Sequence, residues 1–242
     1  MLRLLVSGGP GMVIWSDVDA STADAVIRAE VAYFASLDGG RGRAFEWKLY
    51  GHDPPPDLAG RLLAAGFVSE EPETLLLGST ADVISTSDTN GRALDPVTVR
   101  EVGTDTLDAD LAGIGRLQEA VWHEEFTHGR ELREQALRDP QTLRIHVAEA
   151  PAASGEPLVV SAAWIRFEPG TGFAGLWGGS TLSEWRGRGI YRELVHRRAL
   201  QAAAAGYPYL QVDASPDSRP ILERLGFHAV CETRPYVWTP AP

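Results

Sequence analysis

The chain has 242 residues, of which 44% are hydrophobic and 23% charged, so it is long enough for one large or two small folded domains and is unlike disordered proteins. Its formal net charge of −11 argues against nonspecific binding to nucleic acid or to an anionic membrane, because both need a basic surface. Cys231 is the only cysteine, which excludes an intrachain disulfide and a zinc site built on several thiolates. No stretch approaches the ~18 consecutive apolar residues of a membrane span, and the start of the sequence lacks a full signal-peptide layout. We therefore expect a cytoplasmic protein.

The first eighty residues predict alternating strands and helices. Helical spacing of apolar residues after Ser21 or Thr22 predicts a helix that ends at Asp38–Gly40, and a shorter helix over 57–65 is expected to be closed by Gly66. Apolar or aromatic runs over 12–15, 45–51 and 74–77 predict strands. We interpret 1–80 as one α/β unit.

A polar segment rich in small residues follows, punctuated by Asn90-Gly91, and 81–96 is predicted to be an interdomain linker. The second unit, 97–242, opens with a predicted strand over 97–102. Further strands are expected over 143–148, 158–167 and 209–212 and at the C-terminal end, and helices within 105–123 and over 130–138 and 216–225. The turn between the strands over 143–148 and 158–167 predicts an antiparallel hairpin.

The stretch from Phe173 to Tyr207 is predicted to form a strand, an anion-binding turn and a helix. The sequence Arg186-Gly187-Arg188-Gly189 stands where the helical pattern begins. Amides in the first turn of a helix lack intrahelical partners and carry the positive end of the macrodipole, so they attract phosphate. The two glycines let a diphosphate approach the backbone, and the two arginines add positive charge. Arginine and glycine also occur together in ordinary surface turns, so this motif alone is a modest signal.

A fixed spacing recurs in both halves and predicts a duplicated unit. Asp53 precedes Gly66-Phe67 by the same thirteen positions that separate Asp213 from Gly226-Phe227. The intervening stretches LAGRLLAAGF and RPILERLGF are alike, although two α/β units can share such a helix end by chance. The first half has no RGRG equivalent, so the anion site is expected only in the second.

The order of elements in 97–238 resembles the GNAT superfamily of N-acetyltransferases. The phosphate motif of this family, Arg or Gln, two residues, Gly, one residue, then Gly or Ala, falls on Arg186, Gly189 and Tyr191, where tyrosine departs from the usual small residue. The ILERLGF segment at 221–227 matches as well. The resemblance implies a mixed α/β sheet of the acyl-CoA N-acyltransferase fold, in two tandem units of which the first is degenerate.

The resemblance further implies an enzyme that transfers an acetyl group from acetyl-CoA to a primary amine. The strand end would hold the pantetheine arm, the turn would hold the diphosphate, and Ser215 stands where many family members place a cofactor-contacting asparagine. The implied cofactor-binding residues are Thr181, Leu182, Ser183, Arg186, Gly187, Arg188, Gly189, Ile190, Tyr191 and Ser215. A small-molecule or amino-acid-like amine is the expected acceptor; a protein lysine, or a non-catalytic acyl-CoA-binding role, is the alternative. Self-association of the chain stays open.

The familiar catalytic groups of the family are missing. Leu222 stands where many members have a tyrosine that protonates the departing thiolate, and the strand glutamate is absent from Phe173–Trp177. His123, Glu124 and Glu125, at the end of a predicted helix on the acceptor side, are the candidate proton-transfer residues. A water chain could instead take the proton, because thiols are good leaving groups.

Other reactive side chains are assigned structural roles. His146 lies in an apolar strand and is expected to be a satisfied core histidine, whereas His196 is expected to face solvent and His228 to end a turn. Cys231 is interpreted as a buried thiol. Asp53 and Asp213 share a repeat position, which favours a role in a turn, although Asp213 could face the acceptor.

Overall fold

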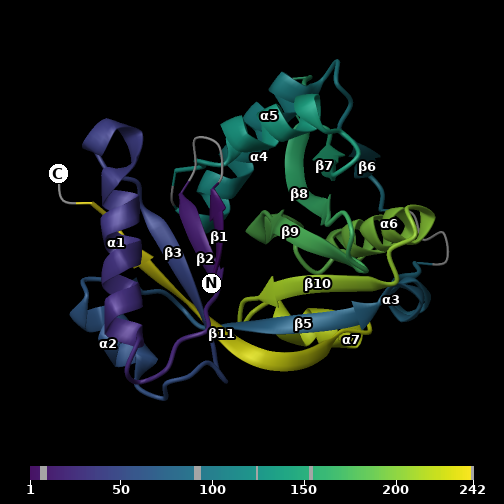
Figure 1. The fold of residues 1–242 in the computed structure, drawn as a ribbon. Coiled ribbons are helices and arrows are strands. Elements are labelled where there is room, and N and C mark those ends of the chain that lie inside the picture. The colour runs from purple at the N-terminus through teal and green to yellow at the C-terminus, as the bar shows by residue number, and fades with distance from the viewer. Residues whose placement is uncertain (6–9, 90–93, 124, 153–154, 241–242) are drawn as a thin grey trace. The chain divides into compact units, whose positions relative to one another are not determined.

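The computed structural model describes residues 1–242 with the exception of 6–9, 90–93, 124, 153–154 and 241–242 (Figure 1). The chain is a mixed α/β protein, as predicted. Its elements up to the middle of the chain are β1 (Leu2–Leu5), β2 (Gly11–Trp15), α1 (Ala23–Gly40), β3 (Phe45–Tyr50), α2 (Leu58–Ala64), β4 (Val68–Ser69), β5 (Glu73–Ser79), α3 (Thr80–Ser87), β6 (Thr98–Glu101) and α4 (Leu107–Trp122). They are followed by α5 (Gly129–Arg138), β7 (Leu143–Ala150), β8 (Leu158–Phe167), β9 (Phe173–Thr181), the 3₁₀ turn η1 (Ser183–Trp185), α6 (Ile190–Ala204), β10 (Tyr209–Ala214), α7 (Arg219–Arg224) and β11 (His228–Trp238).

The chain divides into two compact units that do not follow continuous ranges. Unit 1 contains Met1–Leu75, Asp213–Arg219 and Ala229–Pro242, and unit 2 contains Leu76–Val212 and Pro220–His228. The last strand, which the sequence placed with the second half, thus groups with unit 1. None of the described helices combines the length and the apolar character that crossing a bilayer requires.

The strands of unit 1 follow the order β1-β2-β3-β11, and β4 also pairs with β11. β2 and β3 are parallel, whereas β1 and β11 run antiparallel to their neighbours. Helices α1 and α2 cover one face, where Phe34 stacks on Phe45 with ring centroids 4.0 Å apart and Trp47 is fully buried. Leu37, Asp38 and Gly39 depart from helical geometry, which confirms the predicted end of α1.

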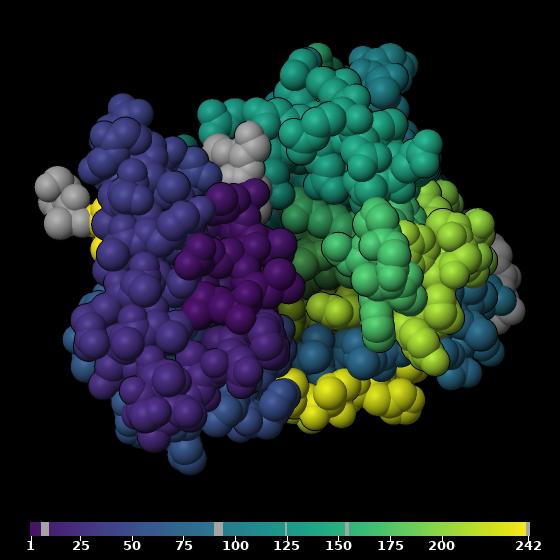
Figure 2. All heavy atoms as spheres, in the orientation of Figure 1, coloured from purple at the N-terminus to yellow at the C-terminus, as the bar shows by residue number. Residues whose placement is uncertain are grey.

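The first strand pair exposes several large apolar side chains. Leu2, Leu4, Leu5 and Trp15 are each between 44% and 52% exposed, and the purple strands of this pair lie on the visible surface of unit 1 in Figure 2. β1 stands at the end of the strand order, so nothing described pairs with its outer edge.

Unit 2 places helices on both faces of its sheet, whose strand order is β5-β10-β9-β8-β7-β6. The strands β6 to β9 are antiparallel neighbours, and the predicted hairpin of β7 and β8 is confirmed. Helices α4 and α5 pack on one face through residues such as Ile114 and Leu132, and α6 packs on the other through Ile190 and Leu194 (Figure 1). The apolar stripes of α4 and α6 explain why each helix needs a sheet face.

Helix α3 occupies the first half of 81–96, where the sequence predicted an interdomain linker and indicated no helix. Ser79 caps the helix by accepting from the amide of Asp82. Arg192 of α6 donates to the carbonyl oxygens of Thr86, Ser87 and Asp88 at the other end, which favours the helix because a cation complements the negative end of its dipole.

This packing also corrects the assignment of His196. Its Nδ1 lies 3.0 Å from the hydroxyl of Ser87 on α3, and the side chain is partly buried instead of facing solvent. The sequence indicated solvent on this side of α6 because it gave no sign of a helix in the linker.

The duplicated spacing corresponds to two matching helix ends. Gly66 and Gly226 have φ angles of +90° and +92°, and the amides of Phe67 and Phe227 each donate to the fifth preceding residue, Leu62 and Leu222, at 3.2 Å. Both copies therefore close their short helix with the same backbone bonds. The strand after this helix is exchanged: β11 pairs with β3 in unit 1, and the residues of β5 from Leu76 onward group with unit 2.

Candidate functional site

The predicted anion turn lies in unit 2 at the start of α6. Gly189 is the residue before the helix and has a φ of +90°, and Gly187 has a φ of +74°. A Cβ atom on Gly187 would meet nothing within 4 Å, so the backbone here is open to an approaching group. First-turn amides without intrahelical partners make such a helix start suited to phosphate.

Both arginines of the turn are exposed and are fixed by backbone carbonyls. Arg186 donates from Nε to the carbonyl oxygen of Thr181 at 3.1 Å, and Arg188 donates to that of Glu184 while lying 4.5 Å from the ring centre of Trp185. These contacts leave both positive charges at the mouth of the turn, where they would strengthen the attraction of a diphosphate.

Tyr191 does not fill the turn. Its ring packs against the strand β9, because a Cβ atom on Gly179 would lie 2.7 Å from Tyr191 Cε2. Burial raises the pKa of Tyr191, and the neighbouring guanidinium of Arg198 partly opposes this rise. The tyrosine therefore occupies room that Gly179 provides, and the departure from a small residue is compatible with an open cradle.

An opening between β9 and β10 begins after Gly175 and follows β9 toward its end. The two parallel strands pair only from Phe173 with Tyr209 to Gly175 with Gln211, although β9 continues to Thr181. Alternate backbone groups of β9 beyond Gly175 thus face away from β8 without a strand partner. These groups could hold an extended ligand and donate to a developing oxyanion.

The strand end is less open than the sequence predicted. The amide of Leu182 donates to Val160 and its carbonyl accepts from Trp185, while the hydroxyl of Thr181 lies 2.8 Å from that of Ser161. Ser183 begins η1, and its hydroxyl donates to Glu184. The open edge of β9 is therefore better placed to bind a pantetheine arm than the backbone groups of 181–183, where the sequence predicted that contact.

A bulge in β9 lies along the open edge. Gly178 and Gly179 together stand opposite Ala163, because Trp177 pairs with Trp164 and Ser180 with Ala162. Gly178 has a φ of +63°, and a Cβ atom there would lie 1.9 Å from the ring of Trp164. Only glycine fits this position.

Side chains from α4 fix the bulge. The buried Gln118 donates to the carbonyl oxygen of Gly178 at 3.0 Å and accepts from Ser180, whose Oγ also accepts from the indole of Trp122. Because these polar groups satisfy one another, the bulge is held in one conformation.

Leu222 has a structural reason to be leucine. Its side chain is fully buried, as is that of its repeat counterpart Leu62. No phenol stands there to protonate a thiolate, as the sequence predicted.

A carboxylate nevertheless lies near the strand residues that lack the family's glutamate. Arg166 of β8 stands opposite Gly175 and donates from Nη2 to Glu131 of α5 at 2.6 Å. The other oxygen of Glu131 lies 3.5 Å from Nδ1 of the exposed His128. Burial raises the pKa of Glu131, but His128 and Arg166 together hold it below its ordinary value. No sequence pattern indicated this cluster, because its members come from two elements far apart in the chain.

The predicted proton-transfer residues are only partly described. His123 ends α4 in the left-handed region with a φ of +59°, and both it and Glu125 are exposed. Glu124 lies outside the described residues. Among the described residues of the site, none forms a hydrogen bond or ion pair with the side chain of His123 or Glu125, and the roles of both stay predictions.

The corresponding helix start in unit 1 has no open turn. The carboxylate of Asp19 accepts from the amides of Ser21 and Thr22 at 2.8 and 2.9 Å, just before α1. Hydrogen bonds from the hydroxyls and amides of Ser21 and Thr22 lower the pKa of Asp19 to about 2. Unit 1 thus supplies its own anion where unit 2 has glycines and arginines.

Unit 1 contains a buried ionic cluster that the sequence did not indicate. Lys48, the only lysine of the chain, is 8% exposed and lies 3.0 Å from Glu73 and 2.9 Å from Asp213. Burial opposes its charge, but Asp213 and Glu73 keep the pKa of Lys48 above its ordinary value. Asp213 therefore forms a buried ion pair at the end of β10, whereas Asp53 has the predicted turn role by accepting from the amide of Tyr50.

Glu46 stands on the same face of β3, and its Oε1 is buried without a described partner. Burial raises its pKa to about 7; Lys48 opposes the rise and Glu73 and Asp213 add to it. A carboxyl whose folded pKa is raised contributes stability below its unfolded pKa that is lost as the pH rises through the folded value.

Glu46→Gln is therefore expected to stabilise the protein at pH 8 by about 2–3 kcal/mol, and hardly at all near pH 4.5. Urea unfolding at both pH values measures the difference. Glu71→Gln, at an exposed position, is the matched control and should change neither value. If Glu46→Gln changes the free energy of unfolding by the same amount at both pH values, the raised pKa of Glu46 is contradicted.

Ser215, His146 and Cys231 do not belong to the turn at the start of α6. Ser215 belongs to unit 1, where its hydroxyl accepts from the amide of Ser218. His146 is buried, but its Nδ1 has no described partner, so it is not the satisfied histidine expected; burial and the nearby Arg198 lower its pKa to about 3. Cys231 is partly exposed instead of buried, and burial still raises its pKa.

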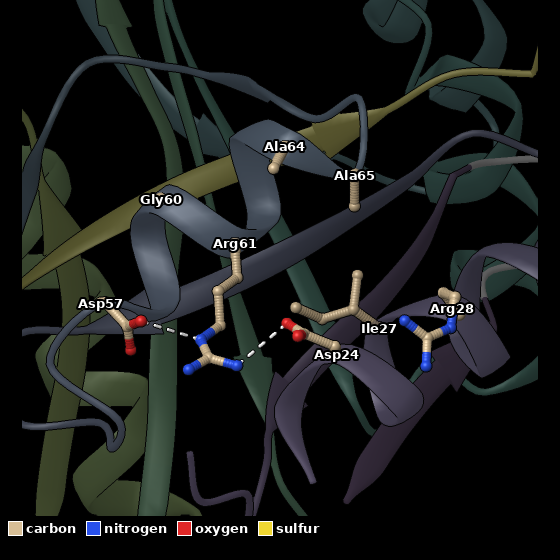
Figure 3. A pocket seen from close by; sticks show the side chains of 8 residues that line it. All are labelled: Asp24, Ile27, Arg28, Asp57, Gly60, Arg61, Ala64 and Ala65. Atoms are coloured by element: carbon tan, nitrogen blue, oxygen red, sulfur yellow. Dashed lines mark hydrogen bonds and ion pairs between the residues drawn. The ribbon is translucent and has the colours of Figure 1, made fainter. Parts of the chain in front are cut away.

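A separate hollow of about 490 Å³ lies between α1 and α2 of unit 1 (Figure 3). Arg61 points into it and is paired with Asp24 at 3.1 Å and with Asp57 at 3.0 Å. Two carboxylates around one guanidinium neutralise its charge, so the hollow does not have the character of an anion site.

No family model and no curated protein matches the chain. Solved structures do share its fold. A GCN5-related N-acetyltransferase from Kribbella flavida is 16% identical with a TM-score of 0.65 over 96% of this chain and 82% of that one. A protein of unknown function from Staphylococcus epidermidis is 10% identical with a TM-score of 0.64 over 96% and 85%.

A tandem GNAT protein from the clavulanic acid biosynthesis pathway is 15% identical with a TM-score of 0.57 over 89% of this chain and 70% of that one. These similarities show the acyl-CoA N-acyltransferase fold that the sequence predicted, including its tandem form.

Proposed function

We propose that the chain is an acetyl-CoA-dependent N-acetyltransferase whose donor site lies in unit 2. The observation that carries this proposal is the open, arginine-flanked start of α6 next to the unpaired edge of β9. The fold of GCN5-related N-acetyltransferases supports it. A small molecule with a primary amine is the proposed acceptor, and the acidic net charge of the chain favours a cation.

The residues present fit acetyl-CoA, whose thioester supplies an activated acetyl group. The amides from Gly187 to Tyr191 would bind the diphosphate, and Arg186 and Arg188 would offset its charge. Unpaired amides of β9 at the bulge would stabilise the oxyanion, because fixed donors need no reorganisation during the reaction.

The donor site is tested by calorimetry with acetyl-CoA on the wild-type protein and on Arg186→Glu/Arg188→Glu. Both side chains are exposed, so the variant is expected to fold and to bind at least about tenfold more weakly. S-acetylpantetheine, which lacks the diphosphate, should bind both proteins alike.

Arg28→Glu on the exposed face of α1 is the control for a change in net charge, and its affinity should equal that of the wild type. If the wild type fails to bind acetyl-CoA, or if the double variant binds it as tightly as the wild type does, the proposed donor site at the start of α6 is wrong.

A second candidate is a protein that binds acyl-CoA without transferring the acyl group. The buried Leu222, in place of an acidic phenol, favours it. A thiol-release assay with a polyamine, an amino sugar, an amino acid amide and a lysine peptide separates the two: tight binding without release from any amine would support this second candidate.

A further inference from the structure

The face of unit 2 that α5 covers holds a second set of polar groups next to the donor strand. Arg166 stands opposite Gly175, which is also the last residue of β9 that pairs with β10. The backbone of Arg166 therefore lies directly across β9 from the point where the opening between β9 and β10 begins. The guanidinium carbon of Arg166 is 5.7 Å from the ring centre of Trp177, the residue before the bulge.

The guanidinium orients a carboxylate, which in turn contacts an imidazole. Glu131 receives the bond from Arg166 through Oε1 and faces Nδ1 of His128 through Oε2. His128 precedes the first residue of α5, and the aromatic ring of Phe126 lies 6.3 Å from the imidazole. With Nδ1 turned toward the carboxylate, Nε2 is the nitrogen left to exchange a proton.

The chemistry of this arrangement suits a general base. An imidazole that faces a carboxylate through one nitrogen is held in one orientation, with its other nitrogen directed away from the carboxylate. The side chain of His128 is 52% exposed, so an acceptor can reach it, whereas that of Glu131 is only 15% exposed. His128 faces the carboxylate of Glu131 from its own helix, and Glu131 in turn pairs with Arg166 from β8.

We propose that His128 is the general base of the acetyl transfer and that Glu131 and Arg166 are its positioning residues. This inference rests on the proposed function. Nε2 of His128 takes a proton from the acceptor nitrogen as the nitrogen forms a bond to the acetyl carbon. The bond from that carbon to sulfur breaks, and the imidazolium returns the proton to the thiolate. One amine and one thioester thus give one amide and one thiol.

The test measures acetyl transfer to the four amines named above as a function of pH. His128→Gln should lower kcat about 100-fold or more and remove the acid limb of the pH–rate profile, because a general base contributes roughly 10²–10⁴-fold. Its Kd for acetyl-CoA should equal that of the wild type, which also shows that the variant is folded. His228→Gln, an exposed histidine at the start of β11, is the matched control and should leave kcat unchanged.

The positioning residues are tested by rescue. Glu131→Gln should lower kcat with an unchanged Kd for acetyl-CoA, and Glu131→Asp, which keeps the carboxylate, should recover part of the loss. If His128→Gln keeps the kcat and the profile of an active wild type, the role of His128 is wrong while the acetyltransferase function stands. A wild type that binds acetyl-CoA but acetylates none of the amines overturns the function, and this inference with it.

Discussion

Replacing Lys48 with methionine is expected to lower the free energy of unfolding by about 3–5 kcal/mol, because it removes one partner of a buried ion pair and leaves the other charged. Lys48 lies within 3.0 Å of both Glu73 and Asp213, and the side chain of Asp213 is 14% exposed. Methionine keeps most of the length of the side chain, so lost packing contributes little. Urea unfolding at pH 7, followed by circular dichroism, measures the change.

The double variant Lys48→Met/Asp213→Asn is the control for this explanation. It removes the charge of Asp213 as well and should be more stable than Lys48→Met alone, since fewer uncompensated carboxylates remain. A loss of less than about 1 kcal/mol in the single variant would show that water reaches the cluster and that its charges are well solvated.

Gly178→Ala is expected to lower the free energy of unfolding by about 2–4 kcal/mol and to reduce acetyl transfer. The new methyl group would overlap the ring of Trp164, and the φ of +63° is unfavourable for any residue with a Cβ atom. Relief of the overlap requires the bulge to move, which displaces the amides that face the opening. Thermal unfolding and kcat measure the two effects.

Gly170→Ala is the control that separates backbone strain at a positive φ from steric overlap with a neighbouring side chain. Gly170 has a φ of +79°, but a Cβ atom there would meet nothing within 4 Å. Its cost should therefore be about 1 kcal/mol, with kcat unchanged. Equal effects at both positions would mean that Trp164 yields easily and that the bulge is not fixed.

Local patterns in the sequence predicted much of the fold and the turn at the start of α6 on which the proposed donor site is based. The RGRG turn, the two Gly-Phe helix ends and the hairpin each depend on residues within a few positions of one another, and backbone conformation there follows from residue type. The absence of the usual tyrosine was also visible, because Leu222 has a fixed distance from Gly226.

Long-range contacts could not be predicted in this way. Lys48 meets Glu73 and Asp213, and Arg166 meets Glu131, across separations that no periodicity encodes. Helix α3 was missed for a different reason: its small polar residues resemble a loop, and packing on α6 decides its conformation.

The exchange of β5 and β11 has a consequence for synthesis and for the deletion of unit 1. Unit 1 includes residues from Ala229 onward, so it cannot be completed until unit 2 has also been synthesised, even though most of unit 1 is made first. A deletion that removed unit 1 would also remove Glu73–Leu75, the first residues of β5, whose remaining residues belong to unit 2. Loss of unit 1 would therefore shorten a strand of the sheet in unit 2.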